Sequence, residues 1–86
     1  MMYQCIAYDK DHDRTYCYGE SENLEFLLSI AMALKPLIDC DELRTTETNE
    51  PIDWMEVVAK DNPNLIYWAS YSLPFIPITR QELQAQ

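Results

Sequence analysis

Apolar and polar residues alternate in two short stretches near the start of the chain. Residues 2–8 and 15–19 are rich in tyrosine and other β-forming residues, and both have the length of a strand. The acidic segment 9–14 between them contains no Asn-Gly or Asp-Gly pair, which predicts a hairpin whose loop is longer than two residues. In one register, a single face of this hairpin carries Tyr3, Cys5, Ala7, Tyr16 and Tyr18.

A helical pattern follows the hairpin. Ser21 is a suitable N-cap, Glu22 suits the first turn, and Pro36 should end or kink the helix near residues 34–38. Two adjacent apolar stripes run along it, formed by Leu24, Leu27, Leu28, Ala31, Leu34 and Ile38 and by Phe26, Ile30, Ala33 and Leu37. The strip that remains for solvent is narrow: Glu22, Glu25, Ser29 and Met32. We therefore expect this helix to be buried on most of its sides.

The second half of the chain begins with a polar, acidic segment, residues 39–50, which predicts a loop or a short edge strand. Pro51 suits a first helical position, and Asp53 and Glu56 have the spacing of a capping box, so a second helix is predicted over residues 51–60. In that helix, Ile52, Met55 and Val58 or Ala59 would point inward, and Asp53, Glu56 and Lys60 outward.

Residues 65–72 predict a strand whose two faces both carry large aromatic rings, from Tyr67, Trp68 and Tyr71. Thr79 and Glu82 predict the cap of a short terminal helix. The order of these elements indicates a single α+β domain over residues 1–86. Its small antiparallel sheet, made of the N-terminal hairpin and a late strand, would pack against two helices.

Charge adds the strongest compositional signal. Fifteen acidic residues face six basic ones, which gives a net charge of −9. The excess is concentrated in residues 39–61, where eight carboxylates face Arg44 and Lys60, a balance of −6. Such a surface repels the phosphates of nucleic acids and anionic membranes, and it attracts basic proteins. A simpler interpretation is that the charge only keeps the protein soluble.

The cysteines and the apolar stretches predict the cellular compartment of the protein. Three cysteines, Cys5, Cys17 and Cys40, are an odd number, whereas small secreted domains usually carry an even framework of disulfides. The N-terminus lacks the pattern of a signal peptide, and the longest apolar stretch, residues 24–38, is too short and too interrupted to span a bilayer. We therefore expect a cytoplasmic protein with free thiols.

One segment has the spacing of a calcium loop. Counted from Asp9, carboxylates fall at positions 1, 3, 5 and 12, the last being Glu20. Position 6, which requires glycine, is Arg14, and the flanking residues alternate like strands. A solvated acidic hairpin tip that includes His12 is therefore the favoured interpretation. The three cysteines form no C-x-x-C pair, so we expect no metal site.

No pattern indicates catalysis. Gly19 is the one glycine in the chain, and a phosphate-binding loop needs several, so we expect no nucleotide cofactor. The single histidine has no evident nucleophile to activate, and no carboxylate stands out as a general acid. We therefore expect a protein that is not an enzyme and that has no cofactor.

In size, charge and lack of motifs, the chain resembles small phage-encoded inhibitors of host defence, such as nucleic-acid mimics and anti-CRISPR proteins. Toxin-neutralising immunity proteins share this profile, and the resemblance covers composition only. It implies an acidic inhibitor or adaptor that docks on a basic surface of a partner protein. One such surface is the groove of a nucleic-acid-binding protein, where the carboxylates would stand in for phosphates. The residues predicted to bind the partner are Asp39, Asp41, Glu42, Glu47, Glu50, Asp53, Trp54 and Glu56. The alternative is a self-associating assembly subunit, such as a homodimer, that buries the apolar first helix.

Overall fold

The N-terminal hairpin pairs strand β1 (Tyr3–Asp9) with strand β2 (Thr15–Ser21) in antiparallel fashion, as predicted. The structure, a computed structural model, describes residues 1–9, 15–70 and 77–84, so most of the predicted turn lies outside the described residues. A β-bulge opposite Cys5 adds one residue to β2, and Tyr16 and Tyr18 both pack against the core beside Cys5. Of the registers that the sequence leaves open, the structure thus has the one in which Tyr3, Cys5, Ala7, Tyr16 and Tyr18 share a face.

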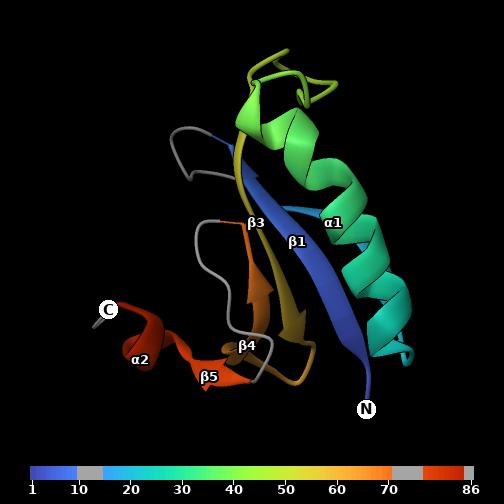
Figure 1. Cartoon of the computed structure of the whole chain (residues 1–86), viewed down its shortest axis with the longest axis vertical. Coiled ribbons are helices and arrows are strands. Elements are labelled where there is room, and N and C mark those ends of the chain that lie inside the picture. The colour runs from blue at the N-terminus through green and yellow to red at the C-terminus, as the bar shows by residue number, and fades with distance from the viewer. Residues whose placement is uncertain (10–14, 71–76, 85–86) are drawn as a thin grey trace.

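Three further strands extend the sheet on the β1 side. They are β3 (Ile52–Ala59), β4 (Asn62–Ala69) and the short β5 (Ile78–Thr79). The order is β2-β1-β3-β4-β5, and every neighbouring pair is antiparallel. Helix α1 (Leu24–Asp39) covers one face, and helix α2 (Arg80–Gln84) lies against the other (Figure 1). The α+β class is confirmed, but the described sheet has five strands where we expected three.

Helix α1 begins two residues later than predicted. Asn23, and not Ser21, is its N-cap, because the Asn23 Oδ1 accepts a hydrogen bond from the backbone N–H of Phe26 at 3.2 Å. The Ser21 hydroxyl oxygen accepts one from the Asn23 N–H at 3.0 Å and so supports the cap from outside the helix. Pro36 does not end the helix, which continues for another three residues to Asp39.

Helix α1 is buried on one side only. Leu27, Ala31 and Ile38 are buried against the sheet, whereas Phe26 and Met32 are 52% and 53% exposed. The expectation that this helix is buried on most sides is therefore wrong, because the described part of the fold places a layer only beneath it (Figure 1). Apolar side chains remain on its outer surface.

The helix predicted over residues 51–60 is wrong, because this segment forms strand β3. Pro51 makes a single bridge to Arg44 before the strand begins. From Met55 to Ala59 every residue of β3 is buried, since the strand lies between β1 and β4 and both of its faces are covered. A strand of this kind lacks the alternation that identifies a strand in a sequence.

The main core lies between α1 and the sheet and includes Cys5, Ala7, Leu27, Ala31, Ile52, Met55, Val57 and Trp68. A smaller cluster on the opposite face contains Val58, Ile66, Ala69 and Ile78. Trp68 faces α1, and Tyr67 occupies a bulge beside it, where its ring meets Tyr3 edge-on at 5.1 Å. The rings of Tyr67 and Trp68 therefore do not lie on opposite faces of β4, as we expected. The third predicted ring, that of Tyr71, lies outside the described residues.

The predicted cap of the terminal helix is confirmed. The Thr79 hydroxyl oxygen accepts a hydrogen bond from the Glu82 N–H at 3.1 Å and lies the same distance from the Glu82 carboxylate, to which it donates. This helix, α2, is only five residues long.

Candidate interaction surface

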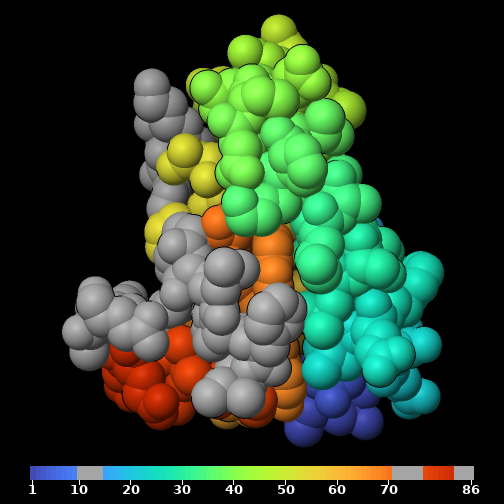
Figure 2. Space-filling model, in the orientation of Figure 1, coloured from blue at the N-terminus to red at the C-terminus, as the bar shows by residue number. Residues whose placement is uncertain are grey.

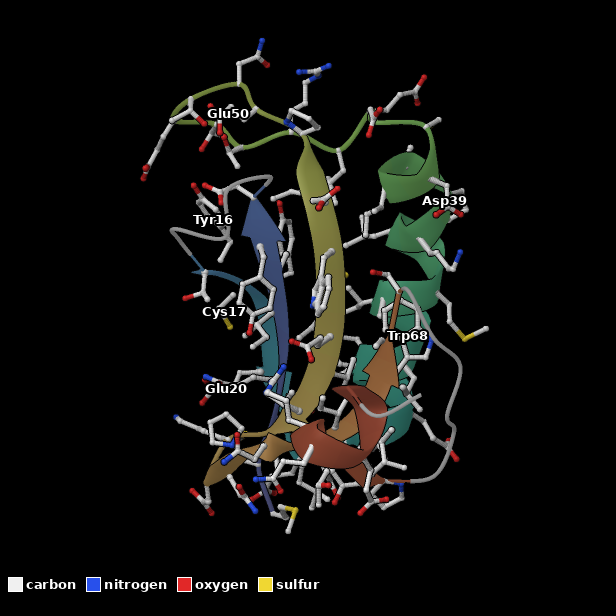
Figure 3. The ribbon with its side chains drawn as sticks, turned by 90° about the vertical axis from the view of Figure 1, so that its left-hand side faces the viewer. Tyr16, Cys17, Glu20, Asp39, Glu50 and Trp68 are labelled. Carbon is white, nitrogen blue, oxygen red and sulfur yellow. The ribbon has the colours of Figure 1, made fainter. Side chains whose placement is uncertain are left out.

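Six acidic residues lie in or beside the loop that joins α1 to β3. This loop is at one end of the molecule (Figures 1 and 2), and Figure 3 labels two of the six, Asp39 and Glu50. We call this group the acidic end; its members are Asp39, Asp41, Glu42, Glu47, Glu50 and Asp53. Glu50 is half-buried and the other five are exposed. Arg44 is the one basic residue of segment 39–53, which leaves a local balance of −5.

Backbone hydrogen bonds give the acidic end a defined shape. The N–H groups of Glu42 and Leu43 both donate to the Leu37 carbonyl, at 2.8 and 3.2 Å, which folds the chain back over the end of α1. The Ile52 N–H donates to the Leu43 carbonyl at 2.7 Å and closes the base of the loop. Four of the carboxylates are therefore carried on an ordered loop, and Asp39 and Asp53 lie on the elements that it joins, so the backbone that carries them is in place before any partner binds.

Thr45 fixes the tip of this loop. Its side chain is nearly fully buried, and its hydroxyl lies 2.6 Å from the Thr48 hydroxyl. The Thr45 N–H donates to the Glu50 carbonyl at 2.9 Å, and the Asn49 N–H donates to the Thr45 carbonyl at 3.0 Å. Asn49 has a φ of 58°, a left-handed conformation that asparagine adopts more readily than most residues. The threonine-rich segment thus serves as the scaffold of the acidic end.

The two cations beside the acidic end are partly engaged. Lys35 forms an ion pair with Asp39 one turn further along α1, at 2.8 Å. The Arg44 guanidinium donates to the Asn49 carbonyl at 2.8 Å and so helps to hold the loop. Both groups lower the local negative charge without cancelling it.

Two of the residues predicted to bind a partner do not belong to this surface. Glu56 is fully buried in β3, so the expectation that it points outward is wrong. Trp54 lies on a strand and not on an acidic helix, and its half-buried ring meets Tyr8 edge-on at 6.2 Å. The other six residues are brought together, and their role in binding stays a prediction.

The buried Glu56 forms an ion pair that the sequence analysis missed. Arg80, from the start of α2, places its Nη1 3.0 and 3.3 Å from the two Glu56 oxygens, and its Nη2 donates to the Pro63 carbonyl at 2.9 Å. Burial, with the Glu56 charge as a second cause, raises the pKa of the neighbouring Tyr8 hydroxyl. This group joins α2 to the sheet; no local pattern indicates it, because the charges are 24 residues apart.

A third ion pair lies near the edge of the sheet. Lys60 donates to Glu20 at 2.6 Å, and Gln4 donates to the same carboxylate at 3.1 Å (Figure 3). These hydrogen bonds lower the pKa of Glu20, and the bond to Glu20 raises the pKa of Lys60.

The same pairing bears on the calcium-loop spacing that begins at Asp9. Glu20 pairs across the hairpin with Gln4. Gln4 is five residues from Asp9 along β1, and five residues of strand span about 17 Å. The carboxylates at positions 1 and 12 of the calcium-loop spacing are thus held apart.

Three classes of feature are missing from the part of the chain that the structure describes. It has no pocket, no group of three side chains suited to hold a metal, and no helix long and apolar enough to cross a membrane.

No family model matches the chain, and the comparisons with curated proteins and with solved structures gave no match either.

Proposed function

We propose that the protein is an acidic inhibitor or adaptor that binds a basic surface of a partner protein through the acidic end. The observation that carries this proposal is the gathering of six carboxylates in segment 39–53, four of them on the ordered loop and one on each element that it joins, with a local balance of −5. Charges that are held in place steer a basic partner and accelerate its approach. A groove that binds nucleic acid is the basic surface this arrangement suits best, since carboxylates would occupy the positions of phosphates.

A pair of variants tests the proposal. In the first, three exposed acids of the acidic end are neutralised: Asp41→Asn, Glu42→Gln and Glu47→Gln. In the second, the same number is neutralised elsewhere on the surface: Glu22→Gln, Glu25→Gln and Asp61→Asn. Both variants have the same net charge, so a difference between them reports the location of the charge and not its sum.

The measurement is capture of binding proteins from the native cytoplasm on each immobilised form, with elution in steps of rising salt and identification by mass spectrometry. We expect the wild type and the second variant to retain a basic protein that is released at moderate salt, where exposed charge pairs are screened. The first variant should retain much less of it, and the association rate with the purified partner should fall more than the dissociation rate changes. Equal retention by both variants, or no basic partner, would contradict the proposal.

Self-association is the second candidate function. It is favoured by the outer surface of α1, where Phe26 and Met32 are more than half exposed. Phe26 shares its flank of the helix with the exposed Ala33 and the half-buried Leu37, and an exposed apolar patch is typical of a surface that another chain covers, whereas Met32 lies on the opposite flank. The cytoplasmic location also stays a proposal, supported by three thiols that are free in the structure.

A further inference from the structure

Strand β2 is an open edge of the sheet. It pairs with β1 on one side, and among the described elements no strand lies on its other side (Figure 3). An open edge presents unpaired backbone N–H and C=O groups that can pair with another strand. Proteins usually protect such edges with prolines or lysines, and β2 contains neither. Its first half, Thr15 to Cys17, is regular, because the bulge and Glu20 both lie in the second half.

An apolar stripe of α1 lies on the same side of the molecule as this edge. A Cβ placed on Gly19 of β2 would lie 3.1 Å from Leu27 Cδ2 and 3.6 Å from Ile30 Cδ1, so this flank of the helix lies over β2. At 100° per residue, Ile30 shares its flank with Phe26, Ala33 and Leu37. Phe26 and Ala33 are exposed, and Leu37 is half-buried. The stripe therefore lies on the β2 side of α1, whereas Met32 lies on the opposite flank of the helix.

The charges favour a second copy of the chain as the occupant of this surface. Two copies that each carry −9 repel one another wherever carboxylates meet. The apolar stripe is uncharged, and Glu20, the one charged residue of β2, is paired with Lys60. When β2 pairs antiparallel with its own copy, a two-fold axis places the two acidic ends at opposite ends of the dimer. Within β2 and the stripe, Glu20 is the one carboxylate and it is paired with Lys60, so a basic partner would find little charge to bind there.

We propose that two copies pair along their β2 edges into one continuous antiparallel sheet, with the apolar stripes of the two α1 helices side by side on one face. This inference rests on the second candidate function and specifies its interface. The acidic ends stay outside the contact, so the dimer would present two of them to partners.

Oligomeric state and cross-linking test this interface together. Phe26→Lys puts a charge on the stripe, and Met32→Lys is its matched control, because the two side chains are equally exposed on opposite flanks. Sedimentation across the micromolar range should show wild type and Met32→Lys as dimers. Phe26→Lys should weaken the dimer at least about tenfold, as a charge at a central apolar contact does. Circular dichroism confirms that each variant is folded.

Cross-linking through Cys17, which is exposed on β2, examines the edge itself. With the two-fold axis at any residue from Tyr16 to Tyr18, the two Cys17 side chains come within about 8 Å. A short bismaleimide should therefore link them in a Cys40→Ser variant, while Cys5 stays unreacted because burial raises its pKa to about 12. A dimer without this cross-link, or one equally sensitive to both lysines, would overturn the edge pairing but leave self-association standing. A monomer throughout would overturn both.

Discussion

Glu56 is the residue whose environment differs most from its appearance in the sequence. It is fully buried in the middle of β3, and Arg80 neutralises it from 24 residues further along the chain. A carboxylate placed in a strand between two others is stable only with such a partner, because an unpaired buried charge is costly. Arg80 also holds the Pro63 carbonyl, so one guanidinium links the start of α2 to both β3 and β4.

Glu56→Gln should destabilise the protein substantially. The amide keeps the size of the side chain but leaves the Arg80 charge without its counter-ion; since Arg80 is partly exposed, we expect a loss of about 3 kcal/mol, the lower end for breaking a buried pair. Urea unfolding followed by tryptophan fluorescence measures it. Glu20→Gln, which breaks the exposed pair with Lys60, should cost much less. Equal losses would show that the Glu56 pair gains nothing from its burial.

At the scale of elements, β3 explains where the sequence analysis failed. Ile52, Met55 and Val58 have helical spacing, and Pro51 with a capping-box pattern supported a helix. The segment forms a strand because its neighbours, β1 and β4, satisfy its backbone on both sides and cover both of its faces. The adjacent β-branched residues Val57 and Val58 were the local signal for a strand, and they were outweighed by the helical spacing.

The helix cap gives a prediction at the same scale. Asn23→Ala removes the side-chain oxygen that accepts from the Phe26 N–H, so α1 should lose a cap and the protein about 1 kcal/mol of stability. Ser29→Ala is the control, because the hydrogen bonds of the Ser29 hydroxyl to described residues all go to carbonyls of its own helix. Thermal unfolding monitored by circular dichroism compares the two. If Ser29→Ala proved the more damaging, Asn23 would not be the functional cap.

At the scale of the whole molecule, the charge distribution separates two surfaces. The acidic end concentrates carboxylates at one end, and the β2 edge with the flank of α1 carries little net charge. In the proposed function and the proposed dimer, this separation would allow a basic partner and a second copy to bind at the same time. It also means that the protein repels itself most strongly at the acidic end, which should reduce its stability at low salt.

Salt should therefore stabilise the protein. Raising NaCl from about 20 mM to about 200 mM shortens the screening length from about 20 Å to about 7 Å, so the melting temperature should rise. The rise should be smaller for the variant with Asp41, Glu42 and Glu47 neutralised than for the variant with Glu22, Glu25 and Asp61 neutralised, because the first three lie on one loop. Scanning calorimetry at both salt concentrations measures the difference. A melting temperature that does not change with salt concentration would show that repulsion between the carboxylates of the acidic end is negligible.

The sequence by itself determined the features that depend on neighbouring residues. The β-hairpin, the existence of α1, the Thr79 cap and the excess of acids after residue 39 all follow from local spacing, and the structure has these elements, although α1 begins two residues later than predicted and the sequence leaves the strand register open. Tertiary structure alone decided that residues 52–59 are a strand, that Glu56 is buried against Arg80, and that the Phe26 flank of α1 lies beside an open sheet edge. Each of these depends on residues distant along the chain, because strand pairing and burial are set by which segments meet in space.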